Sequence, residues 1–275
     1  MKKWLRLFVL GSLAIGGLVL IIFAKKAQNS TELESPEIII HVSDENNFLT
    51  EEEMKLRLKR NGFIGNGLTH EKLNSAKIEK FVRQMSEVKD VKVFSNIGKK
   101  WTVEVTLRKP IVRIFNAYGE SFYLDQDGEI MKTSQIYTAK VVVATGAIKD
   151  RIFGKSVSEI INNDSLKTIR NLDDLYRISN YVCNDPFLRS LIGQIHLEKN
   201  GDFVIIPMIG DHKIIFGTAK TDEDVHEKFN KLMVFYKEAI PYEGWNKYET
   251  INLKYKNQIV GKKKEGYEEQ INKQQ

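Results

Sequence analysis

The sequence predicts an α+β protein with a single N-terminal transmembrane helix, a small β-α-α-β-β domain, and a mainly antiparallel β domain with two or three helices. Three observations support this fold class. Residues 7–24 form an apolar run without a charge. Residues 37–110 show strand and helix patterns in the order β-α-α-β-β. Residues 111–261 contain short strands separated by turn residues.

The charge of the chain is concentrated around the apolar run. The 275 residues include 42 Lys and Arg against 36 Asp and Glu, a formal net charge of +6. Most of this surplus lies in the first 26 residues, which contain no acid; the basic residues there are Lys2, Lys3, Arg6, Lys25 and Lys26. The rest of the chain is almost neutral. Because nucleic-acid binding needs a clustered basic surface, we expect no nucleic-acid partner.

The apolar run predicts a transmembrane helix over residues 4–24, with Trp4 and Ala24 at its ends and membrane lipid around it. Its eighteen uncharged residues span about 27 Å as a helix, close to the thickness of the hydrocarbon core. A cleaved signal peptide is the alternative, but it has a shorter apolar core, and small residues, not Lys25 and Lys26, mark its cleavage site. The basic residues before the run favour a cytoplasmic tail at residues 1–3 and extracytoplasmic C-terminal domains.

Residues 25–36 are predicted to form a linker, and residues 37–110 the small domain. One helix begins at the capping box of residues 50–53 and ends at Asn61-Gly62. A second helix carries an apolar stripe of Ile78, Phe81, Val82 and Met85. The last strand places alternate residues on a buried face, namely Trp101, Val103, Val105 and Leu107.

Residues 111–261 are predicted to form the β domain and residues 262–275 a polar tail. One helix of this domain begins at Asn171 and carries Cys183 on its apolar stripe. Another is capped by Thr221 and buries Val225, Phe229, Leu232 and Tyr236. The final strand is expected over residues 250–260. The other strands are expected at residues 112–116, 121–124, 129–131, 141–145, 194–197, 203–208 and 213–217.

Few residues are arranged for catalysis or metal binding. The five histidines lie far apart, and the single cysteine, Cys183, excludes a disulfide framework and is expected to be a buried, unreactive thiol. Asp125 and Asp127 raise a calcium hypothesis. The other ligands of a calcium loop are missing, however, and Asp127-Gly128 favours a hairpin turn. We therefore expect no cofactor, no metal and no small-molecule substrate.

These features indicate a non-enzymatic protein that binds other proteins. The final strand and the edge strands of the small domain offer backbone groups that a partner strand can pair with. Two alternatives stay open. A membrane-anchored extracytoplasmic hydrolase would need a cleft that joins two or more of His196, His212 and Asp211. A ligand-binding sensor would need a deep apolar pocket in the β domain.

Three stretches of the chain resemble the FtsQ/DivIB family of bacterial cell-division proteins. The β-α-α-β-β unit after a single span is similar to the POTRA domain of that family. Residues 108–113, followed by residues 122–130, are similar to the passage into its β domain, and residues 251–260 are similar to its closing strand. In that closing strand, Asn252 and Lys254 replace the usual acid and arginine, which weakens bidentate pairing.

The resemblance implies a bitopic divisome scaffold that links early and late division proteins in septum assembly at the cytoplasmic (inner) membrane. Its extracytoplasmic β domain is then expected to bind FtsB-like and FtsL-like coiled-coil proteins. We expect this binding to occur by β-augmentation at the last strand. The predicted partner-binding residues are Ile251, Asn252, Leu253, Lys254, Tyr255 and Lys256. The predicted domain junction contains Lys109, Pro110 and Arg113.

Overall fold

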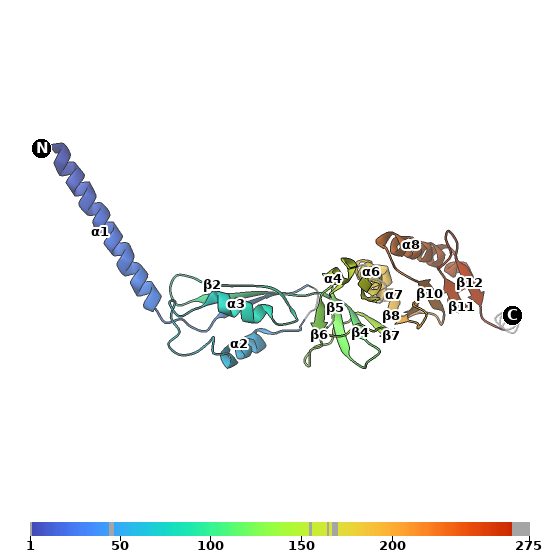
Figure 1. Cartoon of the computed structure of the whole chain (residues 1–275). Helices are drawn as coiled ribbons and strands as arrows, with labels where there is room; N and C mark the ends of the chain where they lie inside the picture. Colours follow the sequence, from blue (N-terminus) through green and yellow to red (C-terminus); the bar gives the residue numbers. More distant parts are fainter. Residues whose placement is uncertain (1, 44–46, 154–155, 164, 167–169, 266–275) are drawn as a thin grey trace. The chain divides into compact units, whose positions relative to one another are not determined.

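The computed structural model describes the chain except residues 1, 44–46, 154–155, 164, 167–169 and 266–275 (Figure 1). Contacts divide the chain into two compact units, Met1–Arg108 and Lys109–Gln275. Each unit has its own sheet and its own hydrophobic core. The division between the units precedes Lys109, whereas the sequence pattern places the boundary after Pro110.

The N-terminal helix α1 comprises Lys2–Ser30. Within the described part of the chain it is the one helix that is long and apolar enough to cross a membrane, and its qualifying stretch Leu10–Ser30 is not buried against the protein. The helix continues beyond Ala24, so the first residues of the predicted linker are helical. Near its end, Gln28 forms hydrogen bonds with His70 and Gly98, and these join α1 to the rest of the first unit.

The first unit packs two helices against a three-stranded sheet and confirms the predicted β-α-α-β-β order. The sheet order is β1-β3-β2, with β1 parallel and β2 antiparallel to the central strand β3. Alternate residues of β3 from Trp101 to Leu107 are buried against apolar residues of both helices. The elements are β1 (Glu37–His41), α2 (Glu51–Arg60), α3 (Ser75–Arg83), β2 (Val88–Ser95) and β3 (Trp101–Leu107).

The second unit is built on a nine-stranded sheet in the order β12-β11-β10-β9-β8-β7-β4-β5-β6. The neighbouring strands are antiparallel except at the pairs β4/β7, β7/β8 and β10/β11, so the sheet is mainly antiparallel, as predicted. The first strands are β4 (Pro110–Phe115), β5 (Ser121–Asp125), β6 (Ile130–Lys132) and β7 (Val142–Gly146). The later strands are β8 (Ile192–Leu197), β9 (Phe203–Pro207), β10 (Lys213–Gly217), β11 (Tyr248–Asn252) and β12 (Val260–Lys263).

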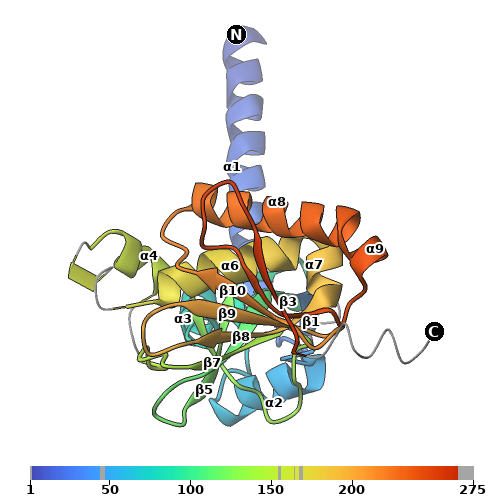
Figure 2. The ribbon, with the colours of Figure 1, turned by 90° about the vertical axis from the view of Figure 1, so that its right-hand side faces the viewer.

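Helices cover one face of the large sheet. Figures 1 and 2 show the two long helices, α6 and α8, on the same side of the strands. As predicted, α8 buries Val225, Phe229, Leu232 and Tyr236, whereas Cys183 of α6 is only half-buried. In the described part of the unit, short helices accompany the two long ones. The helices are α4 (Val157–Ile161), α6 (Leu172–Asn184), α7 (Pro186–Leu191), α8 (Asp222–Glu238) and α9 (Ile240–Glu243).

The prediction of one continuous final strand over residues 250–260 is wrong. Strand β11 ends at Asn252, the chain turns, and β12 returns antiparallel to it. Within the turn, Asn257 adopts a left-handed conformation with φ of 59°. The ammonium group of Lys231 on α8 donates to the carbonyls of Leu253 (3.3 Å) and Tyr255 (2.9 Å). These contacts with α8 bend the chain away from the line of β11.

The turn between β5 and β6 uses Asp125 as an internal acceptor. The Asp125 side chain is buried, and its Oδ1 accepts hydrogen bonds from the N–H groups of Asp127 (3.0 Å) and Glu129 (2.7 Å). Gly128 has a φ of 81°, and a Cβ there would lie 2.8 Å from Cβ of Val157. The arrangement agrees with the hairpin turn. Among the described residues, no group of three or more potential ligands that could hold a metal ion is found.

We expect Asp125→Ala to lower the free energy of unfolding by about 1–3 kcal/mol, because two N–H groups of the turn lose their acceptor. Asp125→Asn keeps an acceptor oxygen in the same place and should lose less stability. Urea denaturation of the full chain in detergent micelles measures both variants. An equal loss for the two variants would contradict this role of Oδ1.

Candidate functional site at the end of the large sheet

Strand β12 forms one end of the nine-stranded sheet. It pairs with β11 on one side, and within the described residues no strand pairs with its other side. All four of its residues are exposed, including the apolar Val260. Its outer edge therefore presents backbone N–H and C=O groups to the surroundings, which is the feature that a partner strand needs.

Side chains on both sides of the pairing fix β12 against its neighbours. Lys262 forms an ion pair with Glu249 (2.6 Å), and Lys264 forms one with Asp211 (3.0 Å). Gly261 lies against the ring of Tyr248, where a Cβ would come within 2.6 Å of Cε1. The close approach at Gly261 and the two ion pairs are consistent with the register that the backbone pairing of β11 and β12 sets.

The predicted partner-binding residues do not form this open edge. β11 pairs with β10 on one side and β12 on the other, so residues 251 and 252 lie in an inner strand. Ile251 and Leu253 are buried in the core. The N–H of Lys254 donates to Oδ1 of Asn252 (2.9 Å), so this backbone donor is already used.

The other predicted residues lie at the turn or inside the β domain. Tyr255 is about half exposed, and Lys256 is exposed beside it in the turn. Lys109 opens the second unit, and Pro110 is the first residue of β4. Arg113 lies in the middle of β4, where its Nε donates to Oγ of Ser121 (3.1 Å). The structure therefore places Arg113 within the β domain.

A groove runs beside the segment that leads into β12. Its volume is about 690 Å³, and it lies between α8 and residues 257–259. Val234 of α8 is 60% exposed in this groove, and Phe235 and Ile259 contribute further apolar surface. Figure 2 shows the chain between β11 and β12 rising alongside α8. The open strand edge and the apolar groove are thus contiguous along the chain.

A buried aromatic cluster supports the start of β10 and the chain before β11. His212 is 1% exposed, and its Nε2 lies 2.7 Å from Oη of Tyr236. The Trp245 carbonyl can only accept, so Nδ1–H of His212 donates to it (3.4 Å) and Nε2 accepts from Tyr236. Burial lowers the pKa of His212, although the hydrogen bond to Trp245 opposes this shift. Burial also raises the pKa of Tyr236.

The residues proposed for a hydrolase have separate partners. His212 is enclosed in the aromatic cluster, and Asp211 pairs with Lys264 at the surface. The Nδ1 atom of His196 lies 2.9 Å from Oγ1 of Thr145. These contacts give no support to a shared catalytic cleft. The groove beside α8 is open to solvent, and so it also differs from the deep pocket that a sensor needs.

Comparison with known proteins places this architecture in a family. The model of the FtsQ/DivIB, C-terminal related family matches residues 109–262, more than half of the chain. The chain belongs to this FtsQ/DivIB-related family. The match begins at the first residue of the second unit and extends into β12. No curated protein matches the chain. Membership in the FtsQ/DivIB-related family associates the chain with bacterial cell division.

The buried His212 makes stability depend on pH. Because its pKa is lowered in the folded state, the unfolded chain binds the proton first as the pH falls below about 6.5. Stability should therefore fall, by up to about 1.4 kcal/mol per pH unit, until the pH reaches the folded-state pKa. Urea denaturation of the full chain in micelles at several pH values measures this slope.

The exposed His226 provides the control for this prediction. His212→Asn should reduce the loss of stability at acidic pH, whereas His226→Asn should leave it as in the unmodified chain. The same pH slope in the His212→Asn variant and the unmodified chain would show that His212 does not carry the effect.

Proposed function

We propose that this chain is a non-enzymatic, bitopic scaffold of the bacterial divisome that links early and late division proteins during septum assembly. Its partners are FtsB-like and FtsL-like coiled-coil proteins and other division proteins. The open outer edge of β12 carries this proposal, because an exposed edge strand is suited to binding a partner strand. Family membership supports the general role in division.

The binding mode we propose is β-augmentation on β12, in place of the inner strand β11 that the sequence pattern favours. A partner strand would take the position next to β12 and extend the sheet by one strand. Apolar side chains next to that strand would enter the groove between α8 and residues 257–259. The backbone pairing then supplies register, while Val234, Ile259 and Tyr255 distinguish among partner side chains.

The proposal also gives the N-terminal part of the chain a location and a role. We propose that α1 crosses the cytoplasmic membrane once, with residues 1–3 inside, and that both units are extracytoplasmic at the division septum. The first unit then acts as a POTRA-like domain, which its β-α-α-β-β order supports. The apolar, unburied surface of α1 supports the membrane span.

Proline substitutions at Lys262 and Lys263 test the strand pairing. Successive residues of an antiparallel strand direct their N–H groups to opposite sides, so one of the two prolines removes an outward donor and the other an inward donor. We expect one variant to keep the stability of the parent chain and to bind the FtsB-like protein about tenfold or more weakly. The other should lose stability through the broken β11–β12 ladder.

Thermal denaturation and binding to the purified FtsB-like protein of the same organism measure these two effects separately. The control variant is Lys80→Ala, because Lys80 is exposed on α3 of the other unit. It should keep both the stability and the binding affinity of the parent chain. If both proline variants fold and bind with unchanged affinity, the outer edge of β12 is not the binding site.

Cysteine labelling tests the proposed orientation. In a Cys183→Ala background, a cysteine at Lys3 should be protected from a membrane-impermeant maleimide in intact spheroplasts, and a cysteine at the exposed Lys80 should be labelled. The reason is that only the extracytoplasmic side is accessible to the reagent. Permeabilised cells provide the control, since both positions should then react. The reverse pattern would contradict the orientation.

A further inference from the structure

The two outer edges of the small sheet differ in whether their backbone groups are already paired. At the β2 edge, helix α3 supplies side chains that pair with the strand backbone. The N–H of Val93 donates to Oε1 of Glu79 (2.8 Å), and Nη2 of Arg83 donates to the carbonyl of Val91 (3.4 Å). Two outward-facing backbone groups of β2 are therefore already paired, which blocks the addition of another strand at this edge.

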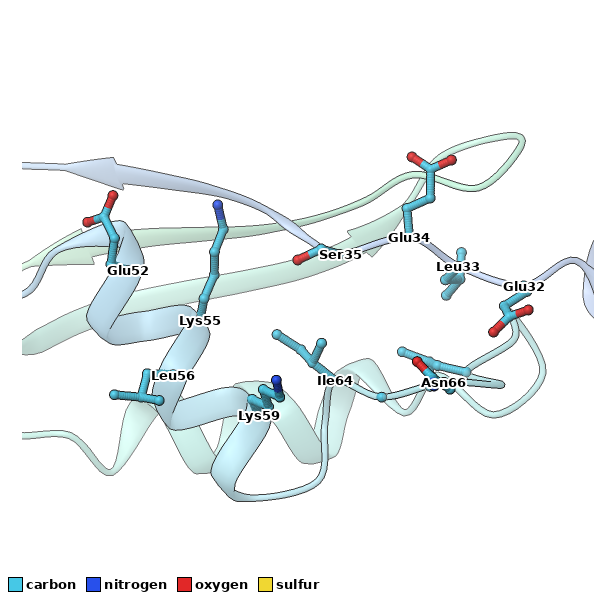
Figure 3. Close-up of a pocket in the computed structure, with 12 residues that line it drawn as sticks. Glu32, Leu33, Glu34, Ser35, Glu52, Lys55, Leu56, Lys59, Ile64 and Asn66 are labelled. Carbon is cyan, nitrogen blue, oxygen red and sulfur yellow. The ribbon is translucent and has the colours of Figure 1, made fainter.

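The opposite edge, at β1, borders a groove. No strand pairs with the outer side of β1 in the described part of the chain. The groove has a volume of about 670 Å³ and lies between residues 32–35, helix α2 and residues 64–68 (Figure 3). Its apolar lining consists of Leu33, Leu56, Ile64 and Leu68. Residues 32–35 lead directly into β1, and the N–H of Leu33 already donates to the carbonyl of Leu68 (2.7 Å). The open edge therefore begins after Leu33, and the groove lies beside its start.

Two lysines of α2 line this groove without an acidic partner. Lys55 and Lys59 form no ion pair among the described residues, and Figure 3 shows both side chains extending from α2 on the side of residues 33–35 and Ile64. The carboxylate of Glu32 is held by the N–H of Gly67 (2.6 Å), and Figure 3 shows the Glu34 carboxylate directed away from α2. The third acid, Glu52, lies one helical turn before Lys55.

The spacing of the two lysines fits an extended chain. Four residues along a helix rise about 6 Å, so Lys55 and Lys59 are separated by that distance along the axis of α2. Alternate residues of an extended strand are separated by about 6.6 Å and point to the same side. Two acidic side chains at positions i and i+2 of a partner strand can thus face the two lysines together.

We propose that this groove binds an extended, acidic segment of a partner protein, which adds to the β1 edge and places alternate carboxylates over Lys55 and Lys59. Apolar side chains on the same segment would contact Leu33 and Ile64. This site lies in the first unit and is independent of the binding proposed at β12. An anionic membrane surface fits less well, because a flat layer of phosphates would also meet Glu52 and the carboxylates of residues 32 and 34.

A defined peptide tests the proposal. The full chain in neutral detergent micelles is titrated against a fluorescein-labelled peptide of alternating Glu and Val, with an alternating Lys and Val peptide for comparison. We expect binding of the acidic peptide only, and Lys55→Glu with Lys59→Glu should weaken it about tenfold by reversing two pairings. Lys80→Glu is the matched control, since Lys80 is an exposed lysine on the neighbouring helix α3, and it should retain binding.

Hydrogen exchange locates the bound peptide. Added acidic peptide should protect backbone amides of residue 35 and of β1, and leave β2 as in the free chain. Absence of binding, an equal loss in the Lys80→Glu variant, or protection at β2 in place of β1 would overturn the proposal. The same applies if α2 is protected only in nanodiscs that contain anionic lipid and not by the peptide, since the ligand would then be the membrane surface.

Discussion

Every open sheet ends in strands whose outward N–H and C=O groups lack a neighbouring strand. The organisation of this chain depends on which of these groups are paired by side chains and which stay open to a partner. In the described residues, two sheets present edges at β1, β2, β6 and β12. The β2 edge is closed by Glu79 and Arg83 of α3. The β6 edge is only three residues long. The remaining two edges each lie beside a groove, and these are the surfaces on which the proposed function rests.

Helix α8 determines where the large sheet ends. Its Lys231 pairs with two carbonyls in the turn after β11, so the chain reverses there and a further strand is added. One turn or so later, Tyr236 of the same helix bonds to His212 before β10. The helix therefore holds both the turn that precedes β12 and the chain that enters β10. Its exposed Val234 lies between these two contacts and lines the groove.

Much of the fold follows from local patterns, because apolar residues that recur every two or 3.6 positions indicate which face of a strand or helix is buried. The alternation from Trp101 to Leu107 and the stripe on α8 are examples. The turn after β11 has a non-local cause: Lys231 precedes the carbonyls that it binds by more than twenty residues. The start of α4 has a local sequence signal, because Ser156 and Glu159 form a capping box. The helix has only five residues, too few to show a helical pattern of apolar residues. The sequence pattern could not place the candidate site at β12, because the position of β12 depends on the turn that Lys231 holds.

The charge distribution explains why strand edges suit this chain as binding surfaces. Beyond residue 26 the chain is almost neutral, so long-range attraction contributes little to meeting a partner. Specificity must then come from short-range contacts, and backbone pairing at an edge supplies register without supplying sequence preference. The side chains next to each edge therefore have to distinguish partners. They do so differently, because the groove at β12 is lined mainly by apolar surface, whereas the groove at β1 adds the two lysines Lys55 and Lys59. A single partner segment matched to one groove would leave unfavourable contacts in the other.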